Sequence, residues 1–278
     1  MRTIVCKNRI INLLLGSKNK DVEVNFKVEN QAFKIVSPDD QYWGSIKDVL
    51  LIREYEYLTE FELQNFKGLI VDAGAHVGLF SIVASRFARK IVSIEPNSKN
   101  YRLLYKNCEE NKIDNILPLN KVLCENEGTV RLYKGVDSGC SSIVKGLNTQ
   151  FNYSQGVTLQ RIIEEFGDID LLKLDVEGAE FGIFQNIEIN YLERINAIVA
   201  EIHLNAGKPE VILKKLRSSG FTTSVFYPPI IKKMGVSTIH VQKLAKLKWF
   251  SLLFYELTRL LGLKEKKFLI LFATRRDD

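Results

Sequence analysis

A buried apolar run that ends in an acid and a glycine-rich turn constrains the fold of this chain more than any other segment. Residues 69–72 form the run, residues 73–78 form the turn, and a helical pattern begins at once with Leu79. This order of strand, tight turn and helix is the unit that binds a nucleotide-like ligand at a helix N-terminus. Gly74 and Gly78 have no Cβ, so the backbone can approach a ligand closely at both positions.

A second predicted strand, residues 90–95, also ends in an acid. Glu95 lies 21 residues after Gly74, close to the spacing of about 20 residues at which an acid meets the ribose hydroxyls in dinucleotide folds. The turn, however, has the pattern Asp-x-Gly-Ala-x-x-Gly rather than Gly-x-Gly-x-x-Gly. This difference favours S-adenosylmethionine as the ligand, and it leaves a hydride-transferring dehydrogenase as the weakest hypothesis.

From Gly68 onward, predicted strands alternate with predicted helices. Such alternation favours an α/β fold with a mostly parallel sheet and helices on both faces. Gly220 follows the last helical pattern and is expected to end that helix. Strands are expected at residues 69–72, 91–95, 116–120, 169–174, 197–202, 222–227 and 268–273, and helices at 79–86, 99–111, 159–165, 181–186 and 209–219.

Residues 1–67 precede this pattern and are expected to form a small α+β cap on a domain of residues 68–278. Residues 22–28 and 32–36 alternate in polarity with period two, which predicts a hairpin. Residues 46–66 are predicted to be mostly helical. We do not expect this segment to fold alone, and we expect it to pack on the larger domain.

An amphipathic segment interrupts the last two predicted strands at residues 228–267. Its aromatic-rich part, residues 243–263, contains Glu256 and Arg259, which argue against a membrane span. Two interpretations remain. The segment packs on the sheet or over the substrate mouth, or it lies on a membrane surface as a peripheral contact.

The content of cysteine and histidine limits the cellular compartment and the kind of metal site that we expect. The four cysteines are scattered without a Cys-x-x-Cys pair, and the chain has three histidines. A zinc site of the Cys/His type and a disulfide framework are therefore not expected, and no metal ligand is assigned. No signal-peptide pattern is recognisable. We therefore predict a cytoplasmic protein, with the membrane surface as an alternative.

The formal net charge of +6 is unevenly distributed. Residues 205–278 carry 15 lysines and arginines against 5 acids, whereas the rest of the chain is weakly acidic. A basic end of this kind can face nucleic acid, an anionic lipid surface or a phosphorylated substrate. It can equally be a solvated basic tail.

Three motifs in sequence order resemble those of FkbM-type methyltransferases. They are residues 72–78, residues 94–96 (Ile-Glu-Pro) and residues 173–180 (Lys-Leu-Asp-Val-Glu-Gly-Ala-Glu), and the last is the most discriminating. The resemblance covers roughly residues 68–205. It implies the Rossmann-like class I fold with a mostly parallel seven-stranded sheet, and S-adenosylmethionine as cofactor. His76 stands where the family usually has Asn, and Gln160 where an acid is common.

Ligands of doubly wound sheets bind beyond the carboxyl ends of the strands, and this position suggests roles for the cofactor site. Glu95 is expected to accept hydrogen bonds from the ribose hydroxyls, and Val122 to flank the adenine. Four residues of the first strand end and turn are expected to shape the pocket for the methionine portion: Asp72, Gly74, Ala75 and Gly78.

Acids at the end of the strand at 169–174 are candidates for contact with the methyl acceptor. The predicted catalytic residues are Asp175, Glu177 and His203, and Glu201 emerges from the same strand as His203. Methyl transfer to a hydroxyl needs removal of a proton, for which His203 or Asp175 is the candidate base. Alternatively, the acids hold a divalent metal that acidifies the hydroxyl.

The resemblance implies an O-methyltransferase whose acceptor is a hydroxyl of a sugar, glycolipid or polyketide-like small molecule. An RNA methyltransferase that uses the basic C-terminal third is the alternative. Residues 175–178 argue against the amino-methylating kind, because those enzymes place an Asn/Asp-Pro-Pro-aromatic motif there. A third hypothesis is a binding module that keeps the fold without catalysis.

Overall fold

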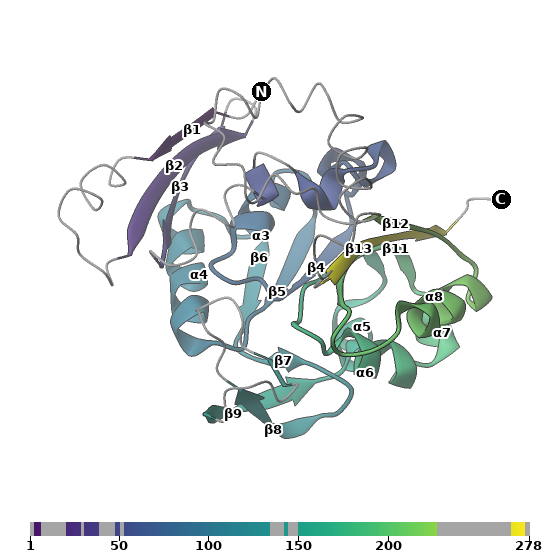
Figure 1. Cartoon of the computed structure of the whole chain (residues 1–278). Coiled ribbons are helices and arrows are strands. Elements are labelled where there is room, and N and C mark those ends of the chain that lie inside the picture. The colour runs from purple at the N-terminus through teal and green to yellow at the C-terminus, as the bar shows by residue number, and fades with distance from the viewer. Residues whose placement is uncertain are drawn as a thin grey trace, which may run out of the picture.

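The computed structural model describes residues 3–6, 21–28, 31–38, 48–50, 53–133, 142–143, 150–226 and 268–275 (Figure 1). At the centre of this part of the chain lies a sheet with the strand order β12-β13-β11-β10-β4-β5-β6. Only β13 runs antiparallel to its neighbours. The strands are β4 (Leu69–Ala73), β5 (Lys90–Ile94), β6 (Ile116–Leu119), β10 (Ile169–Leu174), β11 (Ile195–His203), β12 (Phe221–Phe226) and β13 (Phe268–Arg275).

Helices cover both faces of this sheet, which confirms the predicted α/β class. Successive side chains of a strand point to opposite faces, so Ile70 packs in one hydrophobic core while Leu69 and Val71 pack in the other. Helices α3 (Leu79–Ala84) and α4 (Ser98–Glu110) lie on the first face (Figure 1). The second face carries α5 (Leu159–Phe166), α6 (Glu180–Asn186), α7 (Ile189–Leu192) and α8 (Pro209–Ser218).

Local sequence sets the ends of these helices. The Asn97 side chain accepts hydrogen bonds from two backbone N–H groups at the start of α4, and Thr158 caps α5 in the same way. Pro209 occupies the first turn of α8, where its missing N–H costs nothing. Gly220 follows the C-cap of α8 with φ +86°, so its predicted role in ending that helix is confirmed.

The N-terminal segment contains the predicted hairpin and one further strand. β2 (Val22–Val28) pairs with β3 (Gln31–Ser37), and β1 (Thr3–Cys6) pairs with β2, all antiparallel. The three strands lie beside α4 (Figure 1). A second small sheet, β7-β9-β8, consists of β7 (Val122–Leu123), β8 (Gly128–Tyr133) and β9 (Phe151–Val157).

The prediction of a mostly helical stretch at residues 46–66 is wrong for its described part from Arg53 onward. That part forms three separate 3₁₀ turns, η2 (Glu54–Glu56), η3 (Thr59–Phe61) and η4 (Leu63–Asn65). The Glu56 carboxylate pairs with Arg53 and accepts a hydrogen bond from Leu63 N, so it ties the turns to one another. Burial of Phe61 and Leu63 in the core outweighs helix propensity here.

Asn107 of α4 and Asn111, the C-cap residue of this helix, dock the N-terminal sheet on the domain. Asn107 Oδ1 accepts from Val36 N at 2.8 Å, and its Nδ2 donates to Val36 O at 3.0 Å and to Val77 O at 2.9 Å. Asn111 pairs in the same way with both backbone groups of Lys34. Side-chain amides thus satisfy the free edge of β3, and the sheet shares one hydrophobic core with α3 and α4. The boundary at residue 67 stays a prediction.

The inserted segment at residues 228–267, with its part at 243–263, lies outside the described residues. Its two predicted positions, over the sheet or on a membrane surface, therefore stay predictions. Within the described part of the chain, no helix has the length and apolar character needed to span a bilayer.

Replacing Asn107 with alanine removes three hydrogen bonds between α4, β3 and the glycine-rich turn. We expect the free energy of unfolding to fall by about 2–4 kcal/mol, because buried backbone groups lose their partners at about 1–3 kcal/mol each. Urea denaturation followed by circular dichroism measures this change. Arg102→Ala, exposed on the same helix, is the matched control, with a change below about 0.5 kcal/mol. Equal effects of the two variants would contradict the docking role of Asn107.

Candidate active site

The glycine-rich turn after β4 bends over the end of β5. The N–H groups of Gly74 and Ala75 both donate to Ile94 O, at 2.9 and 3.1 Å. Gly74 has φ +78°, and a Cβ added to it would lie 1.8 Å from the carbonyl oxygen of Asp175. Gly74 is therefore required by close packing against the segment after β10, in addition to any approach of a ligand.

His76 occupies the second of three left-handed positions in this turn, between Gly74 and Gly78, with φ +52°. Asn, Asp and His are the non-glycine residues that adopt this conformation most readily, which explains how His replaces the family's usual Asn. His76 N donates to Glu95 Oε2 at 2.8 Å, so the turn is joined to the end of β5. Gln160, the other departure, donates to Asn186 O between α5 and α6.

Glu95 follows β5 and is 5% exposed. Its carboxylate accepts from His76 N at 2.8 Å, from Asn97 N at 2.9 Å and, more weakly, from Asn100 Nδ2 at 3.5 Å. Burial raises the pKa of Glu95 to about 7, although the backbone donors act in the opposite direction. A carboxylate offers about four acceptor sites, so these three donors leave room for a ribose hydroxyl.

Asp72 is completely buried and ties three elements together. Its Oδ2 accepts from Ser81 Oγ at 2.6 Å, and Ser81 Oγ also contacts Ser93 Oγ at 2.6 Å. Its Oδ1 lies 3.1 Å from the Lys173 ammonium. Asp72 therefore stabilises the base of the turn, and a contact with the cofactor itself stays a prediction.

Lys173 is a buried site residue that sequence reasoning missed. Its ammonium donates to Gly74 O at 2.9 Å and lies 4.0 Å from Asp175 Oδ2, and the residue is 3% exposed. Burial alone would lower the pKa of Lys173, but the charges of Asp72 and Asp175 outweigh burial and raise it. A lysine within the apolar strand at residues 169–174 was the available signal, because a buried cation needs acidic partners.

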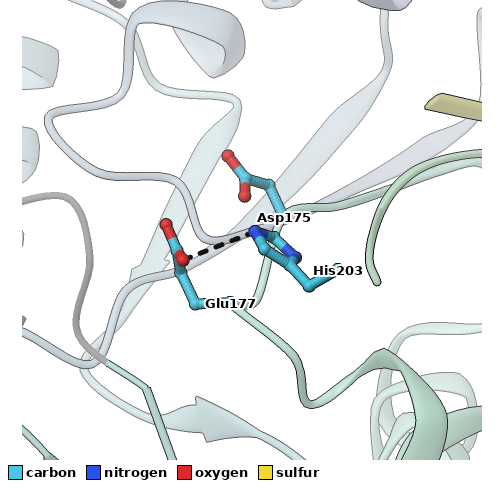
Figure 2. A group of neighbouring side chains, drawn as sticks. All are labelled: Asp175, Glu177 and His203. Atoms are coloured by element: carbon cyan, nitrogen blue, oxygen red, sulfur yellow. Dashed lines mark ion pairs between the residues drawn. The ribbon is translucent and has the colours of Figure 1, made fainter. Parts of the chain in front are cut away.

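The three predicted catalytic residues lie together at the carboxyl ends of β10 and β11. Leu174 pairs with Ala200, so the parallel register brings Asp175 close to the end of β11. His203 Nε2 lies 3.4 Å from Glu177 Oε2, and one ligand-type atom of each of Asp175, Glu177 and His203 lies within 4.8 Å of the other two. Figure 2 shows both carboxylates near the same ring nitrogen.

Glu180 holds the other ring nitrogen of His203. This fully buried carboxylate lies 3.0 Å from His203 Nδ1 and accepts from Val176 N and Gly178 N. Glu180 is also the first residue of α6, where the positive end of the helix dipole favours a carboxylate. Burial lowers the pKa of His203, but hydrogen bonds with Glu177 and Glu180 outweigh this and raise it well above its usual range.

The N-terminal segment contributes Tyr55 to the site, a second residue that sequence reasoning missed. Its hydroxyl donates to Glu201 Oε1 at 2.7 Å and lies 3.4 Å from Asp175 Oδ2. Burial raises the pKa values of both Tyr55 and Glu201. No motif marks Tyr55, because it reaches the site from a 3₁₀ turn whose position depends on packing against Phe80.

Two predicted cofactor residues are mostly buried. Ala75 is 4% exposed within the core beneath α3. Val122 lies in β7, pairs with Gly156 and packs with Cys124 and Leu132. Their proximity to a methionine or adenine group therefore stays a prediction.

Comparison with known proteins shows that the part of the chain that carries the site matches one protein family. The model of the methyltransferase FkbM domain matches residues 72–223, more than half of the chain. Methyltransferase 1 of Beauveria bassiana is 24% identical over 188 residues, which cover 57% of this chain and 74% of that protein. Methyltransferase sdnD of Sordaria araneosa is 28% identical over 188 residues, with coverage of 55% and 73%.

Solved structures resemble the chain only distantly. A methyltransferase FkbM structure from Methylobacillus flagellatus KT gives a TM-score of 0.42 at 12% identity, with coverage of 74% of this chain and 43% of that chain. A precorrin-6y C5,15-methyltransferase from Geobacter metallireducens GS-15 gives 0.41 at 14% identity, with coverage of 77% and 83%.

Gly74→Ala is expected to lower the free energy of unfolding by more than about 4 kcal/mol, because its Cβ would overlap the Asp175 carbonyl and the left-handed backbone adds strain. Gly128→Ala is the matched control. Gly128 has φ +98° with no atom within 4 Å of an added Cβ, so we expect a loss of only about 1–2 kcal/mol. Chemical denaturation of both variants makes the comparison, and equal losses would contradict the packing role of Gly74.

Proposed function

Because the chain belongs to the FkbM methyltransferase family, we propose that it methylates a hydroxyl group of a sugar, glycolipid or polyketide-like small molecule. The reaction class, methyl transfer from S-adenosylmethionine, follows from the family itself. The observation that supports a hydroxyl acceptor is the cluster of Asp175, Glu177 and His203 beside the glycine-rich turn. These side chains can bind a hydroxyl and remove its proton.

The residues around the turn fit the cofactor. S-adenosylmethionine supplies an electrophilic methyl group on a sulfonium centre. Glu95 has acceptor capacity left for a ribose hydroxyl, because its donors are two backbone N–H groups and one long contact from Asn100. The turn from Gly74 to Gly78 would enclose the methionine portion. Lys173 would hold that turn in position through its hydrogen bond to Gly74 O.

Removal of the hydroxyl proton is assigned to Asp175. The hydrogen bonds with Glu177 and Glu180 raise the pKa of His203, which favours its protonated form and makes it a poor base. The Asp175 side chain is 28% exposed and lies at the end of β10, next to the turn. Asp175 would take up the hydroxyl proton of the acceptor when that oxygen receives the methyl group.

The charge of the site disfavours RNA as acceptor. Asp175, Glu177 and Glu180 gather at the carboxyl edge, where their negative charges would repel a phosphate backbone. Most of the basic C-terminal third lies outside the described residues and supports neither acceptor. A binding module without catalysis remains the second candidate, since a cofactor site alone does not guarantee turnover.

Incubation with methyl-labelled S-adenosylmethionine and fractionated host extract tests the acceptor class. We expect label in a nuclease-resistant glycan, lipid or small-molecule fraction. Nuclease-sensitive label would favour the RNA alternative, and absence of any transfer would favour the binding module.

Asp175→Asn should lower kcat by at least about 100-fold, because general base catalysis typically contributes 10²–10⁴-fold. The dissociation constant of S-adenosylmethionine, measured by calorimetry, should stay within about twofold, because Asn has the shape of Asp and Asp72 still pairs with Lys173 at 3.1 Å. Glu188→Gln, an exposed carboxylate at α7, serves as the control with unchanged kcat. A normal kcat in Asp175→Asn would refute the assignment of the base.

The affinity for S-adenosylmethionine should rise about tenfold between about pH 6 and about pH 8, because Glu95 titrates near 7 and its carboxylate form accepts hydrogen bonds better. Burial raises the pKa of Glu95, so ionisation of its carboxyl group lowers the stability of the cofactor-free protein as the pH rises through about 7. Calorimetric titrations across this range measure the affinity. Glu95→Gln should bind weakly with a flat profile, and the same pH profile in both proteins would exclude Glu95 as the titrating group.

A further inference from the structure

We propose that Asp175, Glu177 and His203 form a binding site for one divalent first-row transition-metal ion. Their ligand-type atoms lie within 4.8 Å of one another among the described residues. From the sequence, metal binding by the acids was only an alternative and no ligand was assigned, whereas the geometry points to these three side chains. Its existence is independent of the acceptor, and only its chemical role rests on the proposed hydroxyl methylation.

The distances suit a shared ion. Metal–ligand bonds of about 2.0–2.2 Å place adjacent ligand atoms about 3–3.5 Å apart. The separation of 3.4 Å between His203 Nε2 and Glu177 Oε2 already falls in this range. Asp175 and Glu177 have side chains that are 28% and 27% exposed, so modest rotations can bring their oxygens closer. A cation bound between Nε2 and Oε2 would replace this direct contact.

The surroundings of His203 provide an independent indication. Metal-binding histidines almost always present their other ring nitrogen to a carboxylate or carbonyl, which fixes the ring and its tautomer. Glu180 does this at Nδ1 at 3.0 Å, and the same Oε1 is anchored by two backbone N–H groups. Nε2 is thereby aimed at the two remaining carboxylates, as Figure 2 shows. Tyr55 similarly approaches Asp175 Oδ2 at 3.4 Å.

The donor set selects the class of ion. One imidazole nitrogen and two carboxylate oxygens without a thiolate suit Mn²⁺ or Zn²⁺ better than soft or purely oxygen-seeking ions. Three protein ligands leave coordination positions open for water and for an acceptor hydroxyl. Under the proposed function, the ion would make that hydroxyl more acidic, while the second oxygen of Asp175 stays available for the proton.

Titration of metal-free, chelator-dialysed protein with MnCl₂ alone tests the site. Electron paramagnetic resonance measures the loss of the free Mn²⁺ signal, and we expect about one ion per chain. His203→Gln and Glu177→Gln should each weaken binding by at least about tenfold, and Glu180→Gln by about tenfold through the ring it orients. Glu188→Gln should bind as the unchanged protein does. Circular dichroism confirms that each variant is folded.

A parallel calorimetric titration with ZnCl₂ measures the uptake of Zn²⁺. Absence of stoichiometric uptake of both Mn²⁺ and Zn²⁺, or equal uptake by the folded Glu177→Gln variant, would overturn the metal site. Labelled methyl transfer by chelator-dialysed protein separates the two proposals. Full activity without metal uptake would leave the proposed function intact, whereas metal uptake without transfer to any hydroxyl would leave the site intact.

Discussion

The buried ammonium of Lys173 is the interaction on which the rest of the site depends. It lies under the glycine-rich turn and joins the end of β4 to the end of β10 through Gly74 O, Asp72 and Asp175. A buried cation of this kind is stable only with its acids in place, and the acids are stable only with the cation. The positions of the turn and of the acidic cluster are therefore set by one shared group.

The same balance explains the charge of the site. Five acidic side chains in the described part of the site surround two cationic side chains, Lys173 and His203; the acids are Asp72, Asp175, Glu177, Glu180 and Glu201. Burial raises the pKa of Glu201, which reduces the negative charge but does not remove it. A positively charged sulfonium group or a metal cation compensates such an excess, whereas a phosphate increases the repulsion.

The sequence was informative wherever a local pattern had a single physical solution. Apolar strands alternating with helices specify a sheet buried on both faces, and an acid at the end of the second strand marks the position of Glu95. Tyr55 could not be found in this way, because the 3₁₀ turn η2, which packs through Tyr55 on Phe80, has no periodicity to detect. The reason for Gly74 was also hidden, since the overlapping carbonyl of Asp175 lies about 100 residues further along the chain.

The bond from Tyr55 to Glu201 has a consequence for how this protein could be divided or recombined. A polypeptide that started at Gly68 would keep every recognisable motif of the family, yet it would lose the hydroxyl that covers a buried acid at the end of β11. Exchange of N-terminal segments between relatives would therefore have to carry a matching tyrosine. A boundary drawn at residue 67 from the motifs alone would pass through the middle of one hydrogen-bonded unit.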